Sequence, residues 1–196
     1  MTDIAIIAVW TIASYLLGTV PFGDIVARIA GVDIRSVGTR NPGAANVYRE
    51  IGPKYGIAVF ALDVTKGVVA TAPLLALDLP PWAPLPAAFA VVLGHIFPMI
   101  GSRSGGTGMA TAIGTTAGLA PFGLLAGIPA ALVLLAITRN AGFTGGVLFL
   151  ATALLAWVAR DEIIGPLGVL GIGVLVLAKA RIQYGSLRRR KSQASE

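Results

Sequence analysis

The sequence has no cysteine, only one histidine and few charges, and each shortage excludes a class of function. Without cysteine, the 196-residue chain forms no disulfide and holds no thiolate-bound metal. Its single histidine, His95, excludes a multi-histidine metal centre within one chain. Charged residues make up 12% of the sequence, about half the share in a soluble domain, whereas 56% is hydrophobic. The composition indicates that lipid is the solvent, and we expect neither a metal nor a cofactor.

Long apolar runs predict an all-α integral membrane protein with seven short transmembrane helices and cytoplasmic-side polar loops. A span needs roughly 20 apolar residues. We expect spans at residues 4–29, 56–77, 85–100, 109–120, 122–137, 143–159 and 163–178. Pro21 interrupts the first run, and six crossings are possible if the short run 109–120 is re-entrant. Residues 1–180 then form one membrane domain, and residues 181–196 form a basic cytoplasmic tail.

The basic residues predict the orientation of the chain in the membrane. If the N-terminus lies outside, 13 of the 15 Lys and Arg residues fall on the cytoplasmic side. They are Arg28, Arg35, Arg40, Arg49, Lys54, Arg103, Arg139, Lys179, Arg181, Arg188, Arg189, Arg190 and Lys191. This bias follows the positive-inside rule and favours an outside N-terminus with a cytoplasmic C-terminus. The net charge of +6 therefore reflects topology and contact with membrane lipids, and we expect no binding of nucleic acid.

A polar loop after the first apolar run carries residue types suited to phosphate recognition. Residues 38–49 combine glycines, amides, a hydroxyl and two arginines. Glycine permits positive φ and close backbone approach, and arginine binds phosphate oxygens bidentately. The candidate residues are Thr39, Arg40, Asn41, Gly43, Asn46 and Arg49. A solvated loop whose arginines anchor at the interface is the alternative interpretation.

A second glycine-rich loop precedes the apolar run that begins at Met109. Its sequence is Ser102-Arg-Ser-Gly-Gly-Thr-Gly108. Glycines before a helix expose backbone N–H groups at the positive end of the helix dipole, where anions bind. The candidate residues are Arg103, Gly105, Gly106, Thr107, Gly108 and Thr111. A plain connecting turn is the alternative, but two such loops on one side of the membrane favour a shared phosphate site.

Three ionisable side chains fall within the apolar runs. Asp63 and Lys66 are three positions apart on one helical face, so we expect them to pair. Lys66 and His95 are also candidate substrate contacts, because ionisable groups at this depth are uncommon. The alternative is a structural role for each, through the ion pair for Lys66 and through a backbone hydrogen bond for His95.

Several short motifs follow one another along the chain. They are Leu17-Gly-Thr-Val-Pro-Phe-Gly23, Asp33-Ile-Arg35, Gly38-Thr-Arg-Asn-Pro-Gly-Ala-Ala-Asn-Val47, Leu62-Asp-Val-Thr-Lys-Gly67, Gly94-His-Ile-Phe-Pro98 and Gly105-Gly-Thr-Gly-Met-Ala-Thr111. Their order and spacing resemble the acyl-phosphate-dependent glycerol-3-phosphate acyltransferases of bacteria, the PlsY family. The resemblance implies a multi-pass inner-membrane enzyme without a cofactor. Such an enzyme moves a fatty acyl group from acyl phosphate to glycerol 3-phosphate, giving lysophosphatidic acid for phospholipid synthesis.

The resemblance also implies roles for particular residues. Thr39, Arg49 and Thr107 fall at positions that would act in catalysis, and Gln183 joins the candidate substrate contacts. Family proteins usually have lysine at the positions of Ser104 and Thr107, and a Lys-His-Arg-Glu-Asn motif where this chain has Lys-Ala-Arg-Ile-Gln at residues 179–183. Two alternatives to the acyltransferase therefore stay open. One is a paralogue that binds lipid phosphate without acyl transfer, and the other is a small membrane transporter.

Overall fold

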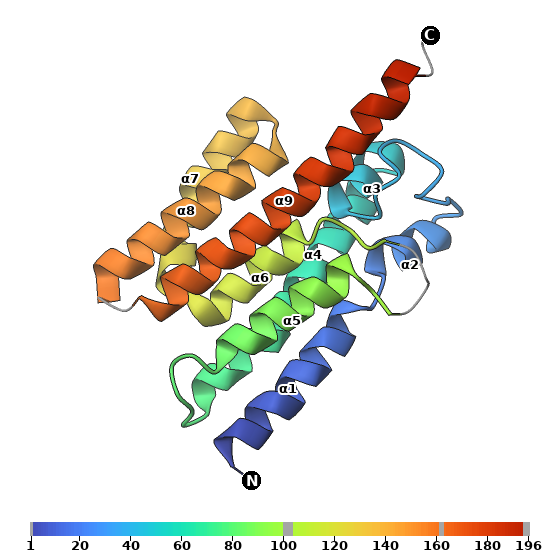
Figure 1. Ribbon diagram of the computed structural model, residues 1–196. Helices are drawn as coiled ribbons and strands as arrows, with labels where there is room; N and C mark the ends of the chain where they lie inside the picture. The colour runs from blue at the N-terminus through green and yellow to red at the C-terminus, as the bar shows by residue number, and fades with distance from the viewer. Residues whose placement is uncertain (1, 100–103, 161–162, 194–196) are drawn as a thin grey trace.

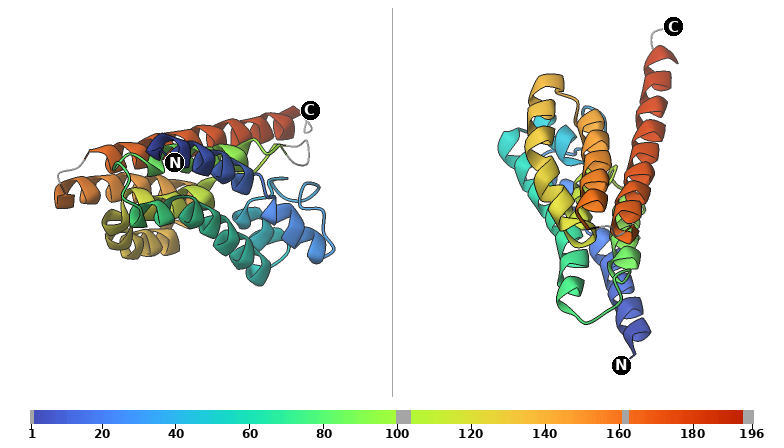
Figure 2. Two further views of the ribbon diagram at one scale, coloured as in Figure 1. Left: turned by 90° about the horizontal axis from the view of Figure 1, so that it is seen from below. Right: turned by 90° about the vertical axis from the view of Figure 1, so that its left-hand side faces the viewer.

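The computed structural model describes residues 2–99, 104–160 and 163–193 (Figure 1). The regular elements within these ranges are all helices, joined by loops, and there is no strand among them. Its helices are α1 (Asp3–Gly18), α2 (Phe22–Ile29), α3 (Ala44–Glu50), α4 (Pro53–Thr71), the 3-10 helix η1 (Ala72–Ala76), α5 (Pro84–Ile96), α6 (Met109–Leu119), α7 (Pro121–Thr138), α8 (Ala141–Arg160) and α9 (Ile164–Gln193). The N-terminus lies at the opposite end of the bundle from the last turn of α9 (Figures 1 and 2).

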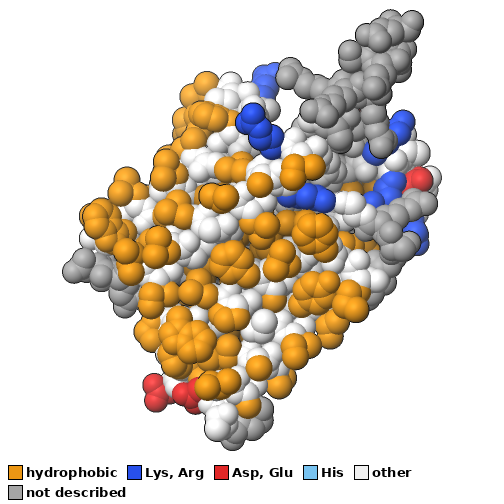
Figure 3. Space-filling model, in the orientation of Figure 1, with side chains coloured by type: hydrophobic (Ala, Val, Ile, Leu, Met, Phe, Trp, Pro, Cys, Tyr) orange, Lys and Arg blue, Asp and Glu red, His pale blue; other side chains and the backbone are white. Residues whose placement is uncertain are grey.

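The helices have the length and surface of membrane-spanning segments. Five of them are long and apolar enough to cross a bilayer within the described ranges. They are Asp3–Ile29, Pro53–Ala76, Pro121–Thr138, Ala141–Ala159 and Ile164–Gln183, and Pro84–Ile96 is a shorter apolar helix. Large apolar side chains face outward, with Ile4 at 74% and Ile137 at 75% exposure. Figure 3 shows hydrophobic side chains over most of the visible face, as expected for a surface in lipid.

Pro21 divides the first apolar run into two helices, as predicted. The proline precedes the first residue of α2 with a non-helical backbone, φ −88° and ψ 68°. Its ring removes one donor and prevents α1 from continuing. The Thr19 hydroxyl donates to the Leu16 carbonyl at 2.7 Å, which satisfies one acceptor at the end of α1. The break exposes the backbone around Gly18 and Val20 to side chains from other helices.

Glycines allow α4 and α6 to cross with their backbones in contact. On α4 and α6, a Cβ at Gly67 would overlap the Thr111 carbonyl oxygen, and a Cβ at Gly114 would overlap the Val64 carbonyl oxygen. Membrane helices associate through such close packing because lipid supplies no hydrophobic driving force between them. The α4–α6 crossing brings Lys66 and Thr111 to the same part of the bundle.

A small separate core supports the first polar loop. It contains Val26 and Ala27 of α2, Ile34 of the loop, Val47 of α3 and Val59 of α4. Ile34 is 1% exposed, so the loop is anchored by an apolar side chain between its polar residues. The short helix α3 lies within the segment that the sequence indicated only as loop. Its packing in this core gives the loop a defined shape beside the main bundle.

The last helix runs past the expected end of the membrane domain. α9 packs against α5, α6 and α8 and continues without a break from Ile164 to Gln193. The predicted division between residues 180 and 181 therefore falls inside a continuous helix. The last turns of α9 extend away from the bundle (Figure 2).

Candidate active site

The side chain of Asn46 determines the shape of the first loop. Its Oδ1 accepts from the Thr39 N–H at 2.9 Å, and its Nδ2 donates to the Val37 carbonyl at 3.2 Å. Asn46 lies on α3 and is 2% exposed, so these bonds are protected from water. Gly38 has φ +54°, and a Cβ there would overlap the Asn46 amide. The amide therefore folds the loop back onto α3, and glycine is required where they meet.

Other predicted residues of this loop differ in what surrounds them. The Asn41 Oδ1 accepts from the Gly43 N–H at 3.2 Å, which stabilises the turn into α3. The hydroxyl oxygen of Thr39 is buried and has no hydrogen-bond partner among the described residues. Arg40, with φ +57°, and Arg49, in the last turn of α3, are exposed. The loop thus offers one unsatisfied hydroxyl and two accessible cations.

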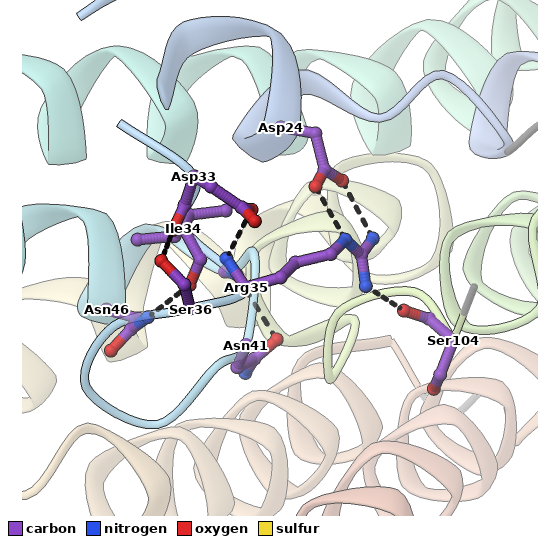
Figure 4. Close-up of polar contacts among 9 residues, drawn as sticks. Asp24, Asp33, Ile34, Arg35, Ser36, Asn41, Asn46 and Ser104 are labelled. Atoms are coloured by element: carbon purple, nitrogen blue, oxygen red, sulfur yellow. Dashed lines mark hydrogen bonds and ion pairs between the residues drawn. The ribbon is translucent and has the colours of Figure 1, made fainter. Parts of the chain in front are cut away.

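Arg35 joins the first loop to the second (Figure 4). Its Nε and Nη2 donate to the two carboxylate oxygens of Asp24 on α2, at 2.6 and 2.8 Å. Its Nη1 donates to the carbonyl oxygen of Ser104 at 2.8 Å. The segment between α2 and α3, which contains residues 38–43 of the first loop, therefore meets the second loop at one end of the bundle, and a phosphate site shared by the two loops stays a prediction. The contact is made by Arg35, which the sequence did not single out as a site residue.

The second loop is packed tightly against the end of α5. The Gly105 N–H donates to the Ile96 carbonyl at 3.1 Å, and a Cβ at this glycine would overlap the His95 carbonyl oxygen. A Cβ at Gly106 would overlap the His95 ring at Nε2. The N–H groups of Gly106 and Thr107 have no hydrogen-bond partner within the described ranges. Gly108, with φ +82°, caps α6.

A buried polar network lies behind these glycines. Lys66 Nζ is 2.9 Å from Asp63 Oδ1, so the predicted ion pair on α4 is confirmed. Lys66 also donates to the Val20 carbonyl at 2.9 Å and lies 3.3 Å from His95 Nδ1. Thr111 Oγ1 lies 3.3 Å from the same nitrogen. The Asp63 carboxylate lies 3.6 Å from this nitrogen as well, so an ammonium, a hydroxyl and a carboxylate all face His95 Nδ1.

A cleft of about 760 Å³ lies between the α1–α2 break, the first loop and the second loop. Its polar wall includes Asp24, Arg28, Arg35, His95, Gly105 and Gly106. The Asp24–Arg35 pair balances its own charge. Arg28 is exposed and has no ion-pair partner in the described part of the chain. Among the described residues, the cleft therefore combines the unpaired cation of Arg28, the carboxylate of Asp33, an imidazole and the backbone of a glycine loop.

The predicted residues divide by their relation to this cleft. His95, Gly105 and Gly106 line it, and Lys66 and Thr111 contact His95 from the protein side. The residues outside its wall are Thr39, Arg40, Asn41, Gly43, Asn46 and Arg49 around the first loop, Thr107 and Gly108 on the second loop, and Gln183 on α9. Arg103 lies outside the described residues.

Sequence reasoning missed two basic side chains that hold the second loop. Arg35 bonds the Ser104 carbonyl, and Lys179 of α9 donates from Nζ to the Ser104 hydroxyl at 2.8 Å. The Lys179 ammonium also lies 5.3 Å from the centre of the Phe97 ring. In the sequence argument Arg35 and Lys179 entered as topology signals and as members of the short motifs at residues 33–35 and 179–183, and neither was assigned a role in the site. Their partners are 69 and 75 positions away, so no local spacing indicated the contacts.

Known proteins with similar sequences share one description. The family described as glycerol-3-phosphate acyltransferase matches residues 8–189. The glycerol-3-phosphate acyltransferase 2 of Dehalococcoides mccartyi is 35% identical over 94% of this chain and 86% of that protein. The glycerol-3-phosphate acyltransferase of Aquifex aeolicus is 41% identical over a shorter alignment, which spans 56% of this chain and 58% of that protein.

A solved structure has the same fold. The crystal structure of PlsY, an integral membrane glycerol 3-phosphate acyltransferase, in its glycerol 3-phosphate form has a TM-score of 0.82 at 30% identity, over 93% of this chain and 92% of that one. Its lysophosphatidic acid form gives a TM-score of 0.80 at 29% identity, with the same coverage. The family match over residues 8–189, the sequence identity over nearly the whole chain and the shared fold show that this chain belongs to the glycerol-3-phosphate acyltransferase family.

Proposed function

We propose that this protein transfers a fatty acyl group from acyl phosphate to the 1-hydroxyl of glycerol 3-phosphate. The products are lysophosphatidic acid and inorganic phosphate. The observation that carries the proposal is family membership over nearly the whole chain, together with two PlsY structures in substrate and product forms. The meeting of two polar loops at one end of a membrane bundle supplies a place for phosphate groups.

The topology we propose has seven crossings, with the N-terminus outside and the polar loops and C-terminus in the cytoplasm. The crossings are the α1–α2 pair and α4, α5, α6, α7, α8 and α9. In support, Figure 3 shows the Lys and Arg side chains of this face at its upper and right-hand end, which holds α2 and α3, with an acidic side chain among them, and only acidic side chains at the opposite end. Residues 1–180 form the membrane domain in this proposal, and residues 181–196 form the cytoplasmic tail.

The proposed chemistry needs no covalent enzyme intermediate, because acyl phosphate is already an activated anhydride. The hydroxyl oxygen of glycerol 3-phosphate bonds to the acyl carbon as the bond from that carbon to the phosphate oxygen breaks. The hydroxyl proton passes to a phosphate oxygen of the substrates. The protein contributes orientation and stabilisation of negative charge.

We assign catalysis to Thr39, Arg49 and Thr107. The Thr39 hydroxyl supports this assignment because it is buried without a partner, a state that costs free energy until a ligand bonds it. The exposed guanidinium of Arg49 is free to bind phosphate. The proposed substrate contacts are Arg40, Asn41, Gly43, Asn46, Lys66, His95, Arg103, Gly105, Gly106, Gly108, Thr111 and Gln183.

A test of the assignment compares the truncation of one arginine, Arg49→Ala, with that of one lysine, Lys54→Ala. Purified protein receives palmitoyl phosphate and labelled glycerol 3-phosphate, and labelled lysophosphatidic acid is measured. We expect Arg49→Ala to lower kcat/KM about 10- to 100-fold, the value of one charge-assisted contact. Lys54→Ala, which removes an exposed cation at the start of α4, should leave it unchanged. Equal activity of native and Arg49→Ala protein would remove Arg49 from the site.

The replaced family residues favour a second candidate, the paralogue that binds lipid phosphate without acyl transfer. Absence of product together with tight binding of lysophosphatidic acid to the purified protein would support it. Accumulation of labelled glycerol 3-phosphate inside sealed vesicles, without product, would instead support a transporter.

Restoring one lysine should raise acyl transfer. Thr107 lies just before α6, beside unpaired N–H groups that already favour an anion. An ammonium added here would act on the same anion as these N–H groups. We expect Thr107→Lys to raise kcat/KM about tenfold in the same assay, and Thr107→Gln, which has a similar length without charge, to give no gain. A fall in activity with lysine would mean that the site is organised around the native threonine.

A further inference from the structure

Arg35 is the one residue that bonds α2, the first loop and the second loop together among the described contacts of the cleft. The side chain is 18% exposed and its partner Asp24 is 15% exposed. Figure 4 shows the guanidinium extending from its loop to lie between Asp24 and Ser104. All three nitrogens are used, since Nε and Nη2 face the carboxylate and Nη1 faces the Ser104 carbonyl.

The ion pair with Asp24 fixes the orientation of the guanidinium. The group is planar, so two parallel bonds from Nε and Nη2 to one carboxylate hold its plane and thereby the directions of the two N–H groups on Nη1. One of these directions is occupied by the bond to the carbonyl of Ser104, which immediately precedes Gly105. The Asp24 charge also neutralises the arginine, so Arg35 is poorly suited to hold a phosphate itself.

The second loop is held from its other side by α5. The Gly105 N–H bonds the Ile96 carbonyl, and the glycine lies against the His95 carbonyl with no room for a Cβ. Residues 104–106 are therefore held between Arg35, which bonds the Ser104 carbonyl, and the end of α5, which bonds the Gly105 N–H. Gly105 and Gly106 form part of the cleft wall in this position.

We propose that Arg35 is a positioning residue that holds the glycine loop at the cleft through the Ser104 carbonyl. The expected effect on acyl-transfer kinetics rests on the proposed function. The contact that holds the loop, from Arg35 to the Ser104 carbonyl, rests on geometry alone. Lys179 contacts the same residue through the Ser104 hydroxyl. The two contacts are separable, because Ser104→Ala removes the acceptor of Lys179 and leaves the carbonyl that Arg35 bonds.

Hydrogen–deuterium exchange of the full-length protein tests the contact between Arg35 and the second loop without reference to activity. We expect Arg35→Met to speed amide exchange in the segment 104–108 about tenfold at Gly105, whose N–H bonds the Ile96 carbonyl, the effect of losing one charge-assisted bond that holds the loop. Ser104→Ala should leave exchange in that segment close to native, and residues 121–160 should be unchanged in both variants. If Arg35→Met does not fold, Asp24→Asn frees the guanidinium and should give the same local increase. Native exchange in residues 104–108 in a folded variant overturns the proposal.

Kinetics separate a positioning role from a merely structural one. In folded Arg35→Met protein we expect KM for glycerol 3-phosphate to rise about tenfold while the unfolding midpoint stays near the native value. Arg35→Lys should recover part of the loss, and Ser36→Ala, which removes only the bond to the Asp33 carbonyl, should keep native kinetics. Unchanged KM and kcat per folded molecule overturn the proposal. If the native protein makes no product but Arg35→Met still speeds amide exchange in the segment 104–108, the contact between Arg35 and the second loop is supported and the proposed function is refuted.

Discussion

Replacing Lys66 with methionine should destabilise the protein by about 3–5 kcal/mol. The Lys66 side chain is 1% exposed and its Nζ lies 2.9 Å from the Asp63 carboxylate, which is 3% exposed. Methionine keeps much of the volume but leaves Asp63 as a buried charge that has lost its ammonium partner and has only the His95 ring nearby, with Nδ1 3.6 Å away. It also releases the Val20 carbonyl at the α1–α2 break. The midpoint of thermal unfolding in detergent should fall well below that of the native protein.

Two further variants identify the cause of that loss. Lys54→Met on the same helix removes an exposed ammonium that lies 4.7 Å from the centre of the Tyr55 ring, and its cost should stay within about 1 kcal/mol. The double change Asp63→Asn with Lys66→Met leaves no unpaired charge and should recover much of the stability. If the double variant is as unstable as Lys66→Met, the ion pair is not what makes Lys66 important.

Much of the fold was predictable because one physical constraint dominates a membrane chain. A backbone in lipid must bond internally, so apolar runs become helices and proline marks a break, as at Pro21. The short helix α3 was not predictable in this way. Its seven residues are mostly polar or small, and its packing depends on Val47 meeting α2 and α4 in a core formed by distant segments.

The candidate site was predictable only where the contacts are local. Asp63 and Lys66 share a helical face, so their spacing indicated the ion pair directly. The bonds of Arg35 to Asp24 and to Ser104 cross 11 and 69 positions and join separate elements, so no spacing within one helix indicated them. The sequence placed Arg35 in a short family-like motif but showed neither of its partners. The roles of Thr39, Arg49 and Thr107 in catalysis stay predictions that the acyl-transfer assay tests.

Replacing Gly67 with alanine should cost about 3 kcal/mol or more, because the added methyl group has only backbone to displace. A Cβ at Gly67 would overlap the Thr111 carbonyl oxygen and lie 2.6 Å from the Thr115 nitrogen on α6. Neither atom is the flexible end of a side chain, so the two helices must move apart. That movement loosens the α4–α6 crossing, and the midpoint of thermal unfolding should fall accordingly.

The same movement should reach the site. Thr111 lies on α6, and the second loop leads directly into this helix. Lys66 and its partner Asp63 lie on α4. Separation of the helices displaces the glycine loop from His95, and we expect kcat/KM for acyl transfer to fall about 100-fold, since a shift near 1 Å costs that much. Gly185→Ala on α9 is the matched control, because its Cβ would meet nothing within 4 Å. It should raise helix stability by about 0.5–1 kcal/mol and leave acyl transfer unchanged. Native stability and activity in Gly67→Ala would show that α4 and α6 are not in backbone contact, and the position of Thr111 beside His95 would need another cause.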